Sequence, residues 1–228
     1  MSHFDPIEST FKVMMFFIPF LFALCFHEFA HGIVAKWKGD RTAEMMGRLT
    51  LNPLAHADPI GTFLFPIVAA YSGFPLFGWA KPVPVNERNL KRPLQDMFWI
   101  SLAGPASNLL LAVIGALGLG LYFRIQGGAM LQGEKGAIAL SEMIQQFVSI
   151  NIFLAIFNLI PLHPLDGGKV IAPFLPPNVN RWLEEMSTYT GFLLMAVFVM
   201  GGGFFIIGAP AHWLSSILFH LAQGVASA

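Results

Sequence analysis

One short run of residues could do chemistry: His27, Glu28, Phe29, Ala30 and His31. On a helix, positions four apart lie about 40° apart around the axis and about 6 Å apart along it. Two imidazoles placed in this way can both reach one zinc ion at about 2.0–2.1 Å. Glu28 follows the first of them and is placed to take a proton from a water molecule that the metal activates. The pattern therefore predicts metal-assisted hydrolysis.

The motif lies late in an apolar run over residues 11–35. A lone histidine on an apolar face is usually a hydrogen-bonded packing residue, and a short pattern also arises by chance in helices. Three ionisable side chains within one turn of a membrane helix are costly, however, and such residues usually serve a function. We therefore favour a metal site over simple packing.

A catalytic zinc site takes a third protein ligand and keeps one position open. Asp166 directly follows the apolar stretch 143–162, where Pro161 and Pro164 would open the helix and Gly167 would let the chain turn. An Asp-Gly pair is also a common turn former. Because the two histidines lack an anionic partner, we favour Asp166 as the third ligand.

Other candidates are weaker. His163 and His56 could also bind the metal, although hydrogen bonding around the site or packing are their more usual roles. Most remaining acids lie in polar tails or connectors and are interpreted as solvated charges; they are Asp5, Glu8, Asp40, Glu44, Asp96, Glu134, Glu142, Glu184 and Glu185.

The composition places these residues in a membrane. Of 228 residues, 55% are hydrophobic and 11% are charged, against about 45–50% and about 25% in soluble domains. This bias is the opposite of that of disordered chains. Since 13 basic residues balance 13 acidic ones, a nucleic-acid binder that works through a basic surface is excluded. The single cysteine, Cys25, excludes an internal disulfide. An integral membrane protein in a lipid bilayer is expected.

Five apolar stretches could position the site, at residues 11–35, 60–79, 97–123, 143–162 and from Gly191 almost to the C-terminus. A span needs about 20 residues, so the first, third and fourth qualify. Proline and glycine interrupt the second, and the last could form one or two helices. The N-terminus has no basic region before its apolar run and no A-x-A-like cleavage site. The first stretch is therefore expected to stay as a membrane helix.

Several motifs together resemble a known family. They are HEFAH at 27–31, NPLAHADPIG at 52–61, GWAKPVPVN at 78–86, SLAGPASN at 101–108 and NLIPLHPLDGG at 158–168. This combination is similar to the site-2 proteases, the intramembrane zinc metalloproteases, and to their short bacterial members without a PDZ or CBS domain. The likeness covers most of residues 20–175. One departure is His163, where the family often has proline.

The resemblance implies a set of roles. Zinc would be bound by His27, His31 and Asp166, with Glu28 as the general base, and Asn108 and Asn158 would help to bind substrate. It also implies an all-α polytopic membrane protein with a three-helix catalytic core, a small membrane-embedded β-hairpin that residues 45–53 match, and one or two extra C-terminal helices. We expect one membrane-embedded peptidase domain over 1–228, with its core at about 11–175 and C-terminal helices at about 188–222.

The metal site also restricts the topology. The ligands lie at one depth if the stretch 60–79 enters and leaves on one face without crossing. Only Lys12, Arg124 and Lys135 then lie opposite the active site, and the other ten of the 13 basic residues lie on its side. A crossing stretch would give a split of 6 to 7. The positive-inside tendency favours the first arrangement, with the active site toward the cytoplasm of a multi-pass protein in a bacterial inner membrane.

These observations predict a zinc endopeptidase that cleaves within or near transmembrane segments of membrane-protein substrates. One alternative is a zinc-binding transporter or channel, since intramembrane His and Asp also mark ion paths. Another is a catalytically silent scaffold with structural zinc, which would need a fourth protein ligand such as His163.

Overall fold

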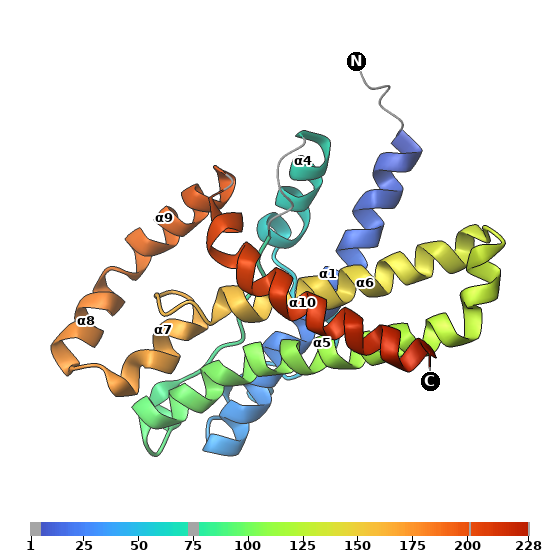
Figure 1. Cartoon of the computed structure of the whole chain (residues 1–228). Coiled ribbons are helices and arrows are strands. Elements are labelled where there is room, and N and C mark those ends of the chain that lie inside the picture. The colour runs from blue at the N-terminus through green and yellow to red at the C-terminus, as the bar shows by residue number, and fades with distance from the viewer. Residues whose placement is uncertain (1–5, 73–77, 201, 228) are drawn as a thin grey trace.

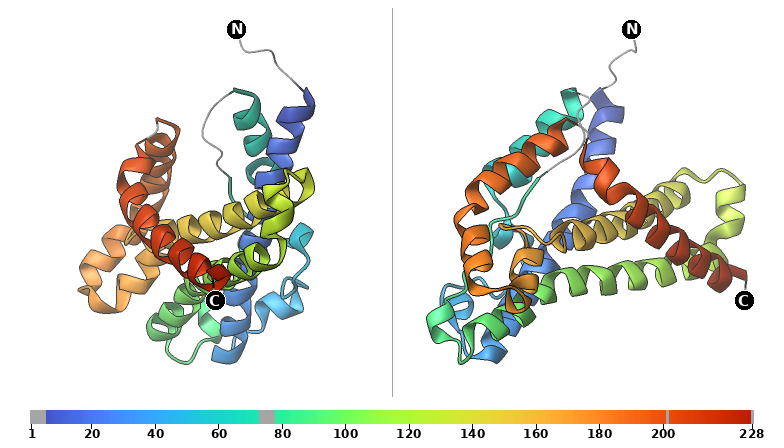
Figure 2. Two further views of the ribbon diagram at one scale, coloured as in Figure 1. Left: turned by 45° about the vertical axis from the view of Figure 1, so that its right-hand side comes forward. Right: turned by 60° about the vertical axis from the view of Figure 1, so that its left-hand side comes forward.

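The computed structural model describes residues 6–72, 78–200 and 202–227, and this part of the chain is largely helical (Figure 1). Three long helices form its centre: α1 (Pro6–Lys38), α5 (Pro93–Leu131) and α6 (Lys135–Asn158). Helices α5 and α6 run antiparallel along each other, and α1 packs against both (Figure 2). The expected all-α fold with a three-helix core is therefore confirmed.

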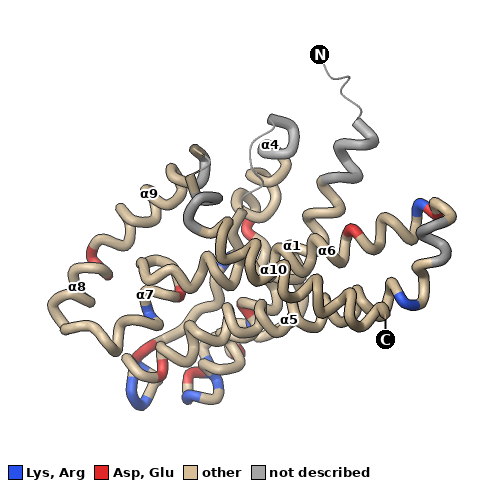
Figure 3. The backbone as a smooth tube through the Cα atoms, in the orientation of Figure 1, with Lys and Arg blue, Asp and Glu red and all other residues tan. Residues whose placement is uncertain are grey.

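Each of these helices contains a stretch that is long and apolar enough to cross a membrane. Within the described residues, the candidate spans are Val13–Lys38, Pro93–Gly127 and Lys135–Asn158. Charged residues gather where α1 ends and α5 begins, and are sparse along the helices themselves (Figure 3). The first, third and fourth apolar stretches, which the sequence predicted as spans, thus lie in helices long and apolar enough to cross a membrane.

Small residues let the central helices approach closely. Ala112 and Ala116 of α5 are fully buried against Val148 and Ile152 of α6. A second cluster joins α1 to α6 through Phe20, Ala23, Leu24, Ile150 and Leu154. This packing fixes the relative position of three helices, and all three contribute side chains around the predicted metal site.

The C-terminal part adds α8 (Pro177–Glu185), α9 (Ser187–Val199) and α10 (Gly203–Ser227). Helices α8 and α9 extend away from the α5–α6 pair, and α10 returns across it (Figure 1). Leu218 of α10 completes the apolar cluster between α5 and α6. The predicted one or two extra C-terminal helices correspond to α9 and α10, and the short α8 precedes them.

The predicted β-hairpin at residues 45–53 is wrong. This segment contains the end of α2 (Thr42–Met45), then irregular turns, and then the start of α3 (Pro53–His56). Gly47 has a φ of 66°, which turns the chain, and the Asn52 side chain accepts a hydrogen bond from the Leu54 N–H and caps α3. The Asn-Pro pair therefore starts a helix and does not belong to a β-hairpin.

The stretch 60–79 forms a π-helical turn (Pro59–Leu64) and α4 (Phe65–Ser72), while residues 73–77 of it lie outside the described residues. Its two ends lie side by side. Ala57 and Ala80 form an isolated antiparallel bridge, and the Lys81 N–H donates to the His56 carbonyl at 2.8 Å. This pairing is what a segment that enters and leaves on one face requires.

Candidate metal centre

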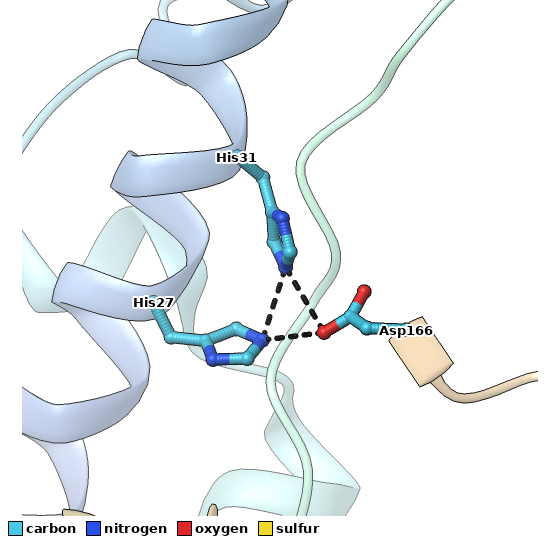
Figure 4. A group of neighbouring side chains, drawn as sticks. All are labelled: His27, His31 and Asp166. Carbon is cyan, nitrogen blue, oxygen red and sulfur yellow. Dashed lines mark hydrogen bonds and ion pairs between the residues drawn. The ribbon is translucent and has the colours of Figure 1, made fainter. Parts of the chain in front are cut away.

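The three predicted ligands converge on one point (Figure 4). His27 and His31 project from α1, and Asp166 begins α7 (Asp166–Ile171). The His27 Nε2 atom lies 3.0 Å from His31 Nε2 and 3.1 Å from Asp166 Oδ2, and the remaining edge, from His31 Nε2 to Asp166 Oδ2, is 3.3 Å. Ligands about 2.0–2.1 Å from a tetrahedral zinc ion lie about 3.3 Å from one another. The triangle therefore has the size of a zinc site.

The hydrogen bonds behind the imidazoles decide which ring nitrogens face this point. His27 Nδ1 lies 2.6 Å from Asn108 Oδ1, and His31 Nδ1 lies 2.6 Å from the Ile100 carbonyl oxygen. Both partners only accept, so each Nδ1 carries the hydrogen and donates it. Each Nε2 then presents a lone pair toward the other and toward Asp166.

Three acceptor atoms that face one another need a cation between them. Asp166 Oδ2 is buried and, within the described part of the chain, has no hydrogen-bond partner. Two neutral imidazoles and a carboxylate are a usual ligand set for zinc. The residues present therefore fit the metal.

A glycine on α5 makes room for both rings. A Cβ atom at Gly104 would overlap His31 Nε2 and would lie 2.6 Å from His27 Cε1. The backbone of α5 thus packs directly on the two imidazoles, which only a residue without a side chain allows. Gly104 was not among the predicted site residues, although it lies inside the SLAGPASN motif that carried the family resemblance.

Glu28 projects to another side of α1. Its Oε2 atom accepts a hydrogen bond of 2.7 Å from the backbone N–H of Val83. A cavity of about 200 Å³ lies beside it, lined by all three predicted ligands, Glu28 and Asn158, among others. The arrangement places an immobilised carboxylate next to the ligand triangle on an accessible cavity.

The segment that holds Glu28 is extended and runs from Trp79 to Asn86; we call it the strap. Asp40, which is fully buried, accepts hydrogen bonds from the Asn86 N–H at 2.7 Å and from Asn89 Nδ2 at 2.8 Å. Burial raises the pKa of Asp40, and these bonds together with those from Thr42 lower it by more. The interpretation of Asp40 as a solvated charge is therefore wrong: it ties the strap to the end of α1.

The two predicted asparagines have different surroundings. Asn158 is half-buried at the end of α6, donates to the Leu154 carbonyl at 3.0 Å, and lines the cavity. Asn108 is fully buried and is not among the residues that line the cavity. Its polar atoms contact His27, the Ala23 carbonyl and Asn151. Asn158 therefore lies where a substrate could contact it, whereas Asn108 lies behind a metal ligand.

Neither further histidine reaches the ligand triangle. His56 Nε2 donates to the Thr50 carbonyl at 2.8 Å, and His56 is not among the residues that line the cavity. The His163 ring is buried against Gly168, and burial lowers the pKa of His163. In the part of the chain that the structure describes, His27, His31 and Asp166 form the group that could hold a metal ion. A closed structural site with His163 as fourth ligand is therefore not observed.

A second, mostly apolar cavity of about 700 Å³ opens next to the first between α1, α6 and α10. The two cavities share His27, Glu28, Pro82, Asn158 and Pro164. The larger cavity therefore adjoins the smaller one, which the ligand triangle lines.

The chain matches Peptidase family M50 over residues 15–129 and 125–201. A protein of Bacillus subtilis (strain 168) named "Putative zinc metalloprotease YwhC" is 38% identical over 190 residues, which cover 83% of this chain and 82% of the relative. The protein Rip2 of Mycolicibacterium smegmatis, named in the same way, is 32% identical over 196 residues, 86% of this chain and 70% of the relative. Rip2 of Mycobacterium tuberculosis (strain H37Rv) is 28% identical over 214 residues, which cover 92% of this chain and 76% of the relative. No solved structure matches the chain.

Proposed function

The chain belongs to peptidase family M50 and is an intramembrane zinc metalloprotease, and on this basis we propose that His27, His31 and Asp166 hold its zinc and that Glu28 is its general base. The observation that carries the proposal is the triangle of three acceptor atoms, 3.0–3.3 Å apart, with Glu28 on the adjoining cavity. The names of the relatives favour a protease over a transporter.

Bound zinc supplies a Lewis acid and lowers the pKa of a water molecule at its open position toward about 7. Glu28 accepts the proton that water loses when it attacks the peptide carbonyl, and later delivers it to the leaving amine. The hydrogen bond from the Val83 N–H keeps the Glu28 carboxylate beside the ligands. Asn108 and Ile100 hold the outer nitrogens of the two histidines, so that their inner nitrogens face the metal.

The substrate we propose is a transmembrane segment of a membrane protein. A helical segment hides its carbonyls in its own hydrogen bonds, so it must open locally before hydrolysis. Asn158, at the junction of the two cavities, is suited to bind the opened backbone through its amide. We assign the whole of residues 1–228 to a single membrane-embedded peptidase domain, with the core at about 11–175.

The site is proposed to face the cytoplasm in a bacterial inner membrane. Two observations support this orientation. Charges gather where α1 ends and α5 begins (Figure 3), and the two ends of the 60–79 stretch lie side by side. With the basic residues concentrated on that face, the positive-inside tendency orients it toward the cytoplasm.

The decisive variant is Glu28→Gln. It keeps the hydrogen-bond acceptor for Val83 and removes the base, so cleavage of a membrane-protein substrate in proteoliposomes is expected to fall by about 10²–10⁴-fold while bound zinc stays unchanged. Glu44→Gln, a partly exposed acid beyond the end of α1, is the matched control and should retain activity. Full activity of Glu28→Gln would overturn the role of Glu28.

A further inference from the structure

Two asparagines in the membrane-spanning helices form a hydrogen-bonded chain that ends at His27. Asn108 on α5 and Asn151 on α6 are both fully buried. Asn108 Nδ2 donates to Asn151 Oδ1 at 2.8 Å, and Asn108 Oδ1 lies 2.6 Å from His27 Nδ1. Buried amides within apolar helices are costly and usually serve a function. This pair joins all three central helices at the depth of the metal ligands.

The orientation of each amide is fixed by backbone carbonyls. Asn151 Nδ2 donates to the Phe147 carbonyl at 2.8 Å, which leaves Asn151 Oδ1 facing Asn108. Asn108 Nδ2 in turn faces two acceptors, Asn151 Oδ1 and the Ala23 carbonyl at 3.2 Å. Exchanging the oxygen and the nitrogen of either amide would place its oxygen against another acceptor oxygen. The Asn108 oxygen must therefore point at His27.

From this we propose that Asn151 and Asn108 are positioning residues that set the tautomer of His27, and through it the affinity for zinc. With Asn108 Oδ1 as an acceptor, His27 must carry its hydrogen on Nδ1, and Nε2 is left with its lone pair for the metal. The inference rests on the proposed function, because it takes His27 to be a zinc ligand.

The other histidine makes the dependence on side chains clear. His31 Nδ1 donates directly to the main-chain carbonyl of Ile100, which no substitution removes. His27 has only a side chain for this purpose, and that side chain is itself oriented by Asn151. Substitutions of groups that orient a metal-bound histidine typically cost about 10–100-fold in metal affinity.

The test measures zinc affinity of the full chain in detergent, by competition with a chelator of known affinity. Asn108→Leu is expected to weaken binding by about 10–100-fold, and Asn151→Leu by a smaller factor. Asn151→Asp, which as a neutral acid still offers one acceptor and one donor, should restore most of the affinity. Ser141→Ala is the matched control, since Ser141 is buried on α6 and donates only within its own helix, to the Ile138 carbonyl.

A double substitution separates orientation from packing. If Asn151 acts through Asn108, adding Asn151→Leu to Asn108→Leu should cause no further loss, whereas two independent packing defects would add. Additive losses, or unchanged affinity in Asn151→Leu, would overturn the proposal. If Asn151→Leu does not fold, Asn151→Ser serves instead, because the serine side chain is too short for its hydroxyl to reach Asn108.

The variant His27→Ala distinguishes this inference from the ligand assignment. Loss of zinc in His27→Ala together with full affinity in Asn151→Leu would reject the positioning role alone. Unchanged zinc affinity in His27→Ala would reject the proposed ligand set itself.

Discussion

The catalytic turn of α1 lies between two different walls. His27 and His31 face a wall of helices, where α5 packs on both rings at Gly104 and binds their outer nitrogens through Asn108 and Ile100. Glu28 faces the strap, which contacts it through one backbone N–H, that of Val83.

The difference teaches that metal binding and proton transfer rest on separate parts of the molecule. The helix wall is buried and held by the packing of α1, α5 and α6. The strap is held by hydrogen bonds along its length: Asn86 donates to Asp40, the Lys81 N–H donates to the His56 carbonyl, and the Lys81 carbonyl accepts from Arg48. Damage to the helix wall should therefore remove zinc, whereas damage to the strap should impair hydrolysis and leave zinc in place.

The largest effect is expected from Gly104→Ala. The added methyl group would overlap His31 Nε2 and crowd His27, so either α5 or the imidazoles must move. We expect zinc affinity to fall by more than about 100-fold, beyond the usual cost of disturbing the groups around a ligand, and activity to fall with it. Metal content after dialysis against a chelator is the measurement.

The control lies on the same helix. A Cβ atom at Gly118 would meet no atom within 4 Å among the described residues, so Gly118→Ala should retain its zinc and its activity. Zinc retained in Gly104→Ala would mean that α5 does not press on the ligands. The claim that the helix wall controls metal binding would then be rejected.

A smaller effect, of a different kind, is expected from Asp40→Ala. The variant removes the hydrogen bonds of Asp40 with Asn86, the last residue of the strap, and with Asn89 just beyond it, and hydrogen bonds to a charged group contribute about 1.5–3 kcal/mol. We expect kcat to fall by about 10-fold with zinc content unchanged, because Glu28 loses its fixed partner. Glu44→Ala, which removes a partly exposed acid nearby, should have little effect. Loss of zinc in Asp40→Ala would contradict the separation of the two walls.

The helix wall was largely predictable, and the strap was not. The spacing of His27 and His31 follows from helix geometry alone, and Asp166 follows an apolar stretch at a point where prolines and glycines let the chain turn. The role of Asp40 depends on Asn86 and Asn89, which are 46 and 49 residues away, so no local pattern reveals it. The false hairpin at 45–53 has a different, local cause: Gly47 turns the chain and the Asn52 side chain caps α3.

Even on the helix wall, the sequence indicated the ligands better than the residues that orient them. Asn151 lies within an apolar run and has no partner nearby in the sequence, since Asn108 is 43 residues away on another helix. The sequence marked Gly104 only as a member of the SLAGPASN motif and gave no sign of its contact with the two histidines. Which face of α5 meets α1 is decided by packing, and that information is absent from any one helix.

The smallest effect expected is the acid dependence of the strap. The pKa of Asp40 is lowered in the folded protein from its ordinary value of 3.8. A lowered pKa means that the charged form stabilises the fold above that value, and that this stability is lost as the pH falls through the folded pKa. The difference in thermal stability between the wild type and Asp40→Asn should thus be full at neutral pH and shrink below about pH 4. Both the wild type and Asp40→Asn are measured without zinc. The titration of Asp166 affects both proteins equally and therefore does not contribute to the difference in their stability. A stability difference that stays constant down to pH 3 would mean that the charge of Asp40 does not hold the strap.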